Sequence, residues 1–250
     1  MIVNAIKTHK ITSDDKDILV VLDKYIEKLE ENSIVAITSK IVSVCEGSTI
    51  KIEDTVDKEK LIRENSQFFL PRSSNKYNIN FTITNNILAA SAGIDESNGN
   101  GYYILWPKNP QDSANKIREF LVNKFKLRSV GVIITDSKTT PLRWGVTGIA
   151  LAHSGFNAVY DYIGKPDLFG RFFEFEKLNI ADSLACSAVM EMGEGNEQTP
   201  LATIQDLKNI EFQARNPTGK ELESIKISME DDLYSPILKN IPWQKGDKSL

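Results

Sequence analysis

An α+β fold with mixed sheets is predicted for this chain of 250 residues. A helical pattern at residues 114–125 lies between the strand-like segments 102–106 and 130–135, and this alternation is typical of proteins that combine both element types. Alternating residues across 79–90, interrupted by Asn85-Asn86, predict an antiparallel hairpin. The length allows one large domain or two small ones, and 41% apolar residues can bury a core.

Composition and charge exclude several classes of protein. The net charge of −4, with Lys and Glu interspersed, gives no basic stripe, so neither nucleic acid nor an anionic membrane surface is expected as the partner. Cys45 and Cys186 are too few for a disulfide framework, and we expect two reduced thiols. The segment 1–10 becomes polar too early for a signal peptide, and no apolar run approaches the roughly 18 residues of a membrane span. A cytoplasmic enzyme is the expectation.

The first predicted elements are a strand at Ile2–Ile6 and a helix that starts near Ser13-Asp14-Asp15. There a cap residue and two aspartates would lie at the positive end of the helix dipole. Five apolar positions then recur at helical spacing: Ile18, Leu22, Tyr25, Ile26 and Leu29. A buried strand follows at 33–38. Ser39-Lys40 comes directly after it, where a turn and a cation could contact phosphate, although a solvated lysine is an equally good reading.

The middle of the chain predicts a helix over 57–70 that stops at Pro71, then the hairpin. Beyond the strand at 130–135, residues 137–145 form a polar loop whose Lys138 and Arg143 are candidates for acidic groups of a substrate, with ordinary solvation as the alternative. The later elements are a strand at 145–154, a loop at 161–171, a helix at 179–192 and a last helix opened by the capping box Thr218–Glu221. For His153, at the end of the strand, a structural role is favoured over a catalytic one.

Two aspartates follow apolar strands beside hydroxyl and amide oxygens. Asp95 lies in the segment Ala92–Asn98, and Asp136 is followed by Ser137. Carboxylates and hydroxyls at two strand ends could share one hard cation such as Mg²⁺. For each aspartate alone a turn residue is favoured over a metal ligand, because Asp bonds its own backbone in turns and connections are commoner than sites.

A third acidic element, Gly193-Glu194-Gly195, favours the metal site. With it, the chain resembles the coenzyme F-420 gamma-glutamyl ligase family. The segments that carry the resemblance are 39–43, Glu46-Gly47, 92–98, 131–137, 161–164, 167–171 and 193–195. It covers most of residues 1–205, and we expect these to form the ligase domain, in two intertwined α/β subdomains, with 206–250 as an extension packed on it.

The resemblance implies an acid–amino-acid ligase that joins the amine of L-glutamate to an acceptor carboxylate through an acyl phosphate. It implies GTP, or ATP, as cosubstrate, two divalent ions (Mg²⁺ or Mn²⁺) and a homodimer. The implied metal ligands are Asp95, Asp136, Ser137 and Glu194. The implied nucleotide-binding residues are Lys7, Thr8, His9, Lys10, Ser39, Lys40, Asn98, Gly193, Gly195 and Asn196. The implied catalytic residues are Lys40 and Arg143.

The sequence departs from the family pattern at three places. Lys7-Thr8-His9-Lys10 replaces an apolar Leu-Pro motif, Val44 replaces a second lysine, and Ser137 replaces a threonine. His9 could contact phosphate, but a lone surface histidine is favoured because no neighbour in sequence completes a site. These changes indicate a divergent branch whose acceptor is a deazaflavin, a folate or another carboxylate. A metal–nucleotide binding protein without ligase activity is the alternative of a different class.

Overall fold

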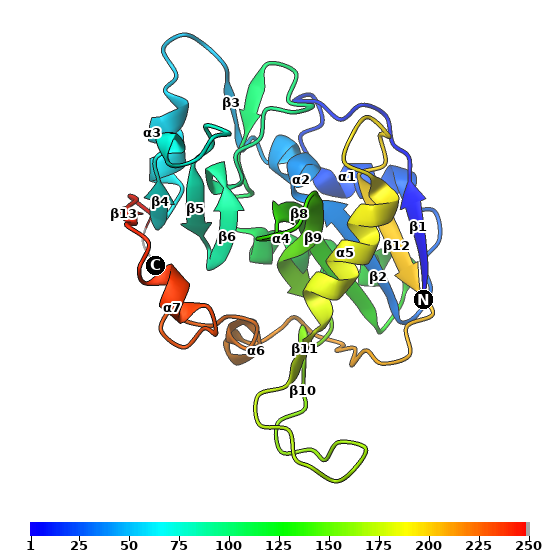
Figure 1. The fold of residues 1–250 in the computed structure, drawn as a ribbon. Helices are drawn as coiled ribbons and strands as arrows, with labels where there is room; N and C mark the ends of the chain where they lie inside the picture. Colours follow the sequence, from blue (N-terminus) through cyan, green and yellow to red (C-terminus); the bar gives the residue numbers. More distant parts are fainter. Residues whose placement is uncertain (249–250) are drawn as a thin grey trace.

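A five-stranded mixed sheet forms the centre of the computed structural model, which describes residues 1–248 (Figure 1). Its strands, in the order β1–β12–β2–β8–β9, span Ile2–Ile6, Leu201–Gln205, Ser33–Thr38, Val130–Thr139 and Val146–Ser154. Strands β2 and β8 run parallel, and the other neighbours are antiparallel. The predicted α+β class with mixed sheets is therefore confirmed.

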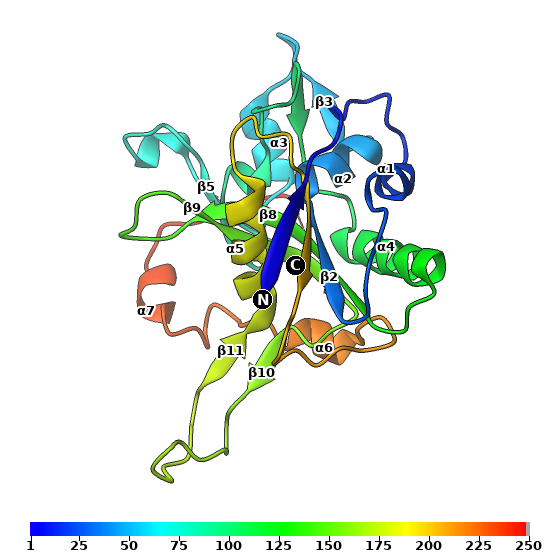
Figure 2. The ribbon, with the colours of Figure 1, turned by 90° about the vertical axis from the view of Figure 1, so that its right-hand side faces the viewer.

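Helices cover both faces of this sheet (Figure 2). One face packs against α1, α2 and α4, which span Ile18–Tyr25, Ser39–Cys45 and Pro110–Phe125, and the other against α5, Ile180–Met192. Strand β2 shows how the sequence serves both layers. Val35 and Ile37 join the first core, whereas Ile34 and Ala36 join the second, because successive side chains of a strand point to opposite faces. Its continuous apolar run is thereby explained.

A second sheet is antiparallel, and a small separate core of Ile62, Ala92, Ile94 and Tyr103 lies in the elements beside it. Its strands β13–β4–β5–β6 span Gln244–Lys245, Phe68–Leu70, Phe81–Thr84 and Ile87–Ala90. The elements beside it are β3 (Thr49–Lys51), α3 (Lys58–Glu64), β7 (Tyr102–Ile104) and the short 3₁₀ turns Arg72–Ser74 and Ser91–Gly93. The predicted hairpin is confirmed: Asn85 and Asn86 join β5 to β6 with φ of 51° and 63°, the left-handed values that a two-residue type I′ turn needs.

Three element predictions were wrong at their boundaries. The helix expected over 57–70 ends at Glu64, because Phe68–Leu70 pairs with β5 and β13 instead. Helix α1 starts at Ile18 with Asp17 as its cap, not near Ser13. The loop expected from Ser137 begins later, since β8 continues to Thr139 in register with β9. In each case tertiary pairing or a local cap decided the boundary.

A long arm projects from the body at the lower end of Figure 1. It comprises β10 and β11, Val159–Asp161 and Lys177–Asn179, with the connecting residues between them. The loop expected at 161–171 lies within it. Along the arm, Lys165 lies over the ring of Tyr160, 4.0 Å from the centroid, and Tyr162 packs edge-on against both Tyr160 and Phe173.

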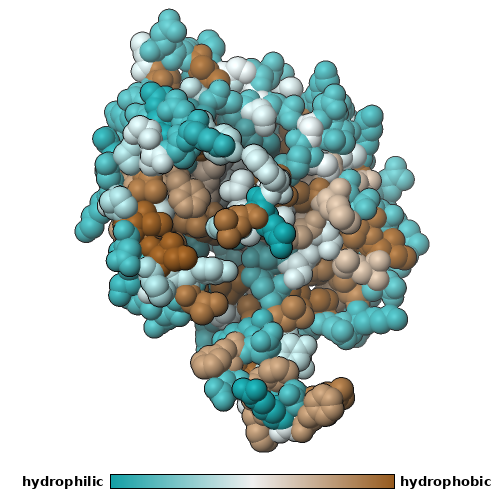
Figure 3. All heavy atoms as spheres, in the orientation of Figure 1, coloured by the Kyte–Doolittle hydropathy of each residue, from teal (hydrophilic) through white to brown (hydrophobic). Residues whose placement is uncertain are grey.

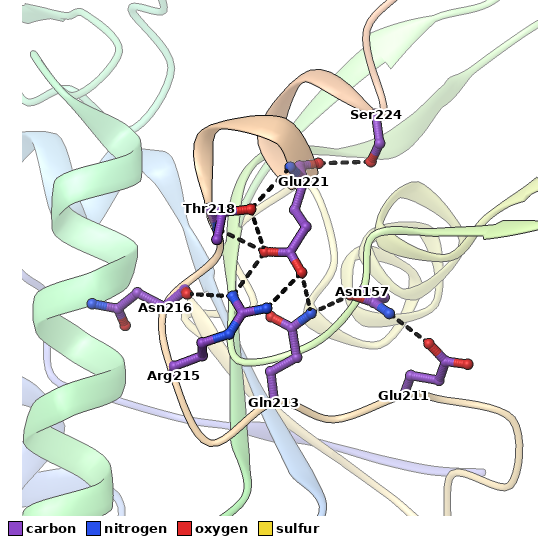
Figure 4. Close-up of polar contacts among 8 residues, drawn as sticks. All are labelled: Asn157, Glu211, Gln213, Arg215, Asn216, Thr218, Glu221 and Ser224. Atoms are coloured by element: carbon purple, nitrogen blue, oxygen red, sulfur yellow. Dashed lines mark hydrogen bonds and ion pairs between the residues drawn. The ribbon is translucent and has the colours of Figure 1, made fainter.

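The C-terminal segment runs from the central sheet back to the second sheet. Helix α6, Gly219–Glu223, has the predicted capping box, but it is not the last helix, because α7 follows at Ser235–Leu238. Figure 4 shows Glu221 accepting from Arg215, Gln213 and Thr218, and these donors hold the pKa of its carboxyl well below its usual range. Residues 249 and 250 of the expected extension lie outside the described residues. No helix within 1–248 combines the length and apolar character needed to cross a membrane.

Candidate active site

A cavity of about 520 Å³ lies where the parallel pairing of β2 with β8 ends. Thr38 and Thr135 are the last residues paired in register, so Lys40 in the first turn of α2 and Asp136, the next residue of β8, both reach this cavity. Crevices at the carboxyl ends of parallel strands are the usual ligand sites of sheets that contain them. The central sheet thus fixes the position of the two groups.

Most of the predicted site residues line this one cavity. They are Thr8, His9, Lys10, Lys40, Asn98, Asp136, Ser137, Gly193, Glu194, Gly195 and Asn196. Four others do not line it: Lys7, Ser39, Asp95 and Arg143. Ser39 is buried in the first turn of α2, and Arg143 lies in the exposed connection between β8 and β9. The structure therefore brings eleven of these residues together. Arg143, which was predicted to be catalytic, does not line the cavity of its own chain.

Asp95 is held by Lys40. The Lys40 ammonium lies 2.6 Å from one carboxylate oxygen of Asp95 and 3.1 Å from the hydroxyl of Ser97, and the Ser97 N–H donates to the other carboxylate oxygen at 2.7 Å. Burial alone would raise the pKa of Asp95, but the lysine and the N–H outweigh it and lower the pKa. Asp95 is thus an ionised group whose charge is already neutralised.

Asp136 is in the opposite state. Burial raises the pKa of its carboxyl to about 6, and the negative charge of Asp95 adds to this effect. The N–H of the Trp106 indole donates to Oδ2 and opposes the rise, together with the Ser137 N–H and the more distant Lys40. No ion pair with Asp136 is present among residues 1–248. A carboxylate desolvated in a cavity wall without a cation is a candidate functional group.

The loop at 193–200 connects the other walls of the cavity. The Ser137 hydroxyl donates to Glu194 at 3.2 Å, and the amide of Asn98 donates to the Gly195 carbonyl at 2.9 Å. Gln198 is joined to Thr8 by two bonds, from the Thr8 N–H at 3.1 Å and to the Thr8 carbonyl at 2.5 Å. Residues that are 57 to 190 positions apart in the sequence therefore meet at one loop.

Gly193 ends α5 in a conformation that other residues rarely adopt, with φ of +79°. A Cβ there would lie 2.5 Å from the Glu197 carboxyl carbon, and that carboxylate accepts from the Gly195 N–H at 2.8 Å. The glycine is thus required for the loop to turn back over the cavity.

His9 is not the lone surface histidine that was expected. Its Nδ1 lies 2.7 Å from the Tyr25 hydroxyl, and its Nε2 lies 2.8 Å from a carboxylate oxygen of Asp15. The backbone N–H of His9 also donates to Tyr25, at 2.8 Å. These contacts hold the loop that lines the cavity against α1, so His9 positions the loop. Sequence reasoning missed them because Tyr25 comes a full helix later, and it also missed Trp106 and Gln198.

The residues present fit a divalent cation by donor chemistry. Asp136, Ser137 and Glu194 line the cavity, and Asp95 is paired with a lysine that lines it. All four donors are oxygens, which suits Mg²⁺ or Mn²⁺ rather than a soft metal. Within residues 1–248 no three His, Cys, Asp or Glu side chains are already assembled as a metal-binding group. A cation would consequently have to draw these donors together.

The chain is similar to known proteins over most of its length. The family model for F420-0:gamma-glutamyl ligase matches residues 1–206. The chain is 35% identical over 225 residues to the coenzyme F420:L-glutamate ligase of Methanococcus maripaludis strain C7, which covers 88% of this chain and 85% of the relative. The enzyme of the same name from Methanocaldococcus jannaschii is 33% identical over 226 residues, covering 82% and 86%. That from Methanosarcina acetivorans is 32% identical over 194 residues, covering 72% and 76%.

Proposed function

This chain belongs to the F420-0:gamma-glutamyl ligase family, and we propose that it is a nucleotide-dependent gamma-glutamyl ligase acting on L-glutamate and a small acceptor with a carboxylate. One observation carries the proposal. The three acidic segments 92–98, 131–137 and 193–195 meet at a single cavity through the Asn98–Gly195 and Ser137–Glu194 contacts. Asp136 lies within β8 and not in a turn, and turn formation would not require the segments 92–98 and 193–195 to converge on it.

The reaction we propose proceeds through an acyl phosphate. A carboxylate oxygen of the acceptor bonds to the γ-phosphorus of GTP while the bond from that phosphorus to the β–γ bridging oxygen breaks, and GDP leaves. The amine of L-glutamate then bonds to the acyl carbon, inorganic phosphate leaves, and the nitrogen gives up a proton. The family likeness supports this route. It needs no nucleophilic serine or cysteine from the protein.

The side chains of the cavity supply positioning and charge. The Lys40 ammonium is the cation nearest Asp95 and can turn from it to phosphate oxygens. Residues 7–10 and the loop at 193–196 flank the cavity where backbone N–H groups can approach the nucleotide, whether GTP or ATP. Asp95, Asp136, Ser137 and Glu194 would hold the divalent ions. Two such ions, when bound, neutralise charge on the transferring phosphoryl group.

Two chemical classes of acceptor are candidates for this ligase, a deazaflavin and a folate. The relatives are named for coenzyme F420, which favours a deazaflavin acceptor. The polar Lys7–Lys10 segment and Val44, both in or next to the cavity wall, favour a different acceptor such as a folate.

Phosphate release measured with GTP, Mn²⁺ and L-glutamate tests the ligase and its acceptor together. We expect release only when a deazaflavin or a folate acceptor is added, with mass spectrometry showing the acceptor extended by one glutamyl residue. Nucleotide binding without such a product for any carboxylate acceptor would support the alternative of a metal–nucleotide binding protein.

A homodimer is part of the proposal, and the arm supports it. Leu168, Phe169 and Phe175 expose 90%, 92% and 87% of their surface. Apolar side chains are visible at the tip of the arm in Figure 3. Exposed apolar groups of this size on a projecting hairpin are typical of a surface covered by a second copy. Analytical ultracentrifugation should give twice the chain mass of 28.0 kDa, and the monomer mass at every concentration would contradict the dimer.

A further inference from the structure

Trp106 links the two segments that carry the aspartates. It lies two residues after the end of β7, is 9% exposed, and does not line the cavity. Its indole N–H donates to Oδ2 of Asp136. Two residues earlier, the backbone of Ile104 exchanges both hydrogen bonds with Asp95, at 2.8 and 3.0 Å. A stretch of three residues thus contacts Asp95 by its main chain and Asp136 by a side chain.

Gly93 explains how the indole reaches this place. A Cβ on Gly93 would lie 2.1 Å from Cε2 and 2.2 Å from Nε1 of Trp106, so only a glycine leaves room for the ring. The residue also has φ of +73°, which a side chain would strain. Gly93 belongs to the same segment as Asp95. The indole is therefore packed between the backbone of the Asp95 segment and the carboxylate of Asp136.

The contact is more specific than core packing requires. Trp243, by comparison, donates its indole N–H to the backbone carbonyl of Leu238 at 2.8 Å, which is an ordinary way to satisfy a buried indole. Trp106 instead donates to a carboxylate that lines the cavity. Bonds of this kind fix which oxygen of a carboxylate faces a ligand and which faces the protein.

We propose that Trp106 is a positioning residue. Its indole N–H occupies Oδ2 of Asp136 and so leaves Oδ1 to face a divalent cation that Asp136 and Asp95 would bind together. The proposal rests on the metal site of the proposed function. Gly93 is the second part of the device, because it sets how close the indole and the Asp95 segment lie. Removing the N–H should weaken metal binding about 10–100-fold, the usual loss when an outer-shell partner of a metal ligand is removed.

The first test is Mn²⁺ affinity by calorimetry in the presence of saturating GDP. We expect the Kd for Mn²⁺ to rise about 10–100-fold in Trp106→Phe and to stay unchanged in Trp243→Phe, a matched loss of an indole N–H away from the cavity. Equal affinity in a Trp106→Phe protein that melts cooperatively would overturn the positioning role. Absence of Mn²⁺ binding by the wild type would overturn the metal site itself, and this inference with it.

A second measurement keeps Trp106 and is independent of how well Trp106→Phe folds. The chain has three tryptophans, so Trp144→Phe/Trp243→Phe leaves Trp106 as the only indole. Paramagnetic Mn²⁺ should quench its fluorescence with the Kd found by calorimetry. Mn²⁺ binding that leaves this fluorescence unchanged would place the ion away from Asp136 and would overturn the inference.

Discussion

The segment that carries Asp95 and the strand β8 that carries Asp136 hold their carboxylates in opposite electrostatic states beside one cavity. At the turn, Lys40 lies 2.6 Å from the carboxylate, and the pKa of Asp95 is lowered. Within β8, burial raises the pKa of Asp136 to about 6, and an indole N–H is its side-chain partner. The Asp95 carboxylate has a cation beside it, whereas no ion pair neutralises Asp136 among residues 1–248.

This difference indicates how the site is divided. A buried carboxylate without a counter-charge costs free energy of folding, and such cost is typical of a group retained for function. A carboxylate paired with lysine costs little but must give up its partner to bind a metal. Asp136 should therefore dominate metal affinity, while Asp95 and Lys40 should respond together when nucleotide binds. The predictions below test this division.

The largest effect is expected for Asp136→Asn. Turnover should fall by about 1,000-fold or more, because outer-shell changes alone cost about 10–100-fold. The metal-free variant should nevertheless be more stable than the wild type at neutral pH, by as much as about 3 kcal/mol, since each pKa unit corresponds to about 1.4 kcal/mol. Thermal melting and glutamate-dependent phosphate release should be measured on one preparation.

Asp57→Asn is the matched control for that variant. Asp57 caps α3, and asparagine caps helices equally well. Its stability and turnover should therefore match the wild type. If Asp136→Asn behaved like this control, Asp136 would be an ordinary residue of β8 without a role in metal binding, and the comparison would fail.

Lys40→Met should have the next largest effect. The cavity would lose the lysine that pairs with Asp95, so we expect kcat/KM for the nucleotide to fall on the order of 100-fold. Lys58→Met removes a neighbouring lysine that pairs with Glu96 of the same turn but does not line the cavity. A similar loss in both variants would mean that folding of the turn, and not contact with phosphate, explains the effect.

Metal affinity should depend on pH through Asp136. A carboxyl whose pKa is higher in the folded protein than in the unfolded chain stabilises the fold at low pH, and this contribution is lost as the pH rises through about 6. Mn²⁺ needs the ionised form, so its affinity should fall about tenfold per pH unit below 6. Calorimetry at several pH values checks this. A Kd that is constant from pH 7 to pH 5 would assign the metal to other ligands.

The smallest effect is expected at the loop that His9 holds. Tyr25→Phe removes a hydroxyl that contacts both the backbone N–H and the ring of His9, and it should raise KM for the nucleotide several-fold, since such a bond contributes about 1 kcal/mol. The kcat should change little because the phosphoryl contacts lie elsewhere. An equal fall in kcat at unchanged KM would show that this loop acts in the chemical step.

Local patterns in the sequence determined much of the fold. The hairpin at β5–β6 was predictable because Asn85-Asn86 supplies the left-handed turn, and the capping box of α6 because its two partners are three residues apart. The buried strands β2 and β8 were predictable from their apolar runs. The resemblance to the family added which acidic segments belong together.

Only the tertiary structure decided the contacts that give the site its properties. Phe68–Leu70 was predicted to be the end of a helix, but it is a strand because it pairs with β5 and β13. Lys40, the partner of Asp95, lies 55 residues away along the chain, and Trp106, the partner of Asp136, lies 30 residues away. A pKa depends on burial and on charges in space. The sequence therefore identified Asp95 and Asp136. The packing of the chain decided that Asp95 is paired with a lysine and that Asp136 is buried without a cation beside it.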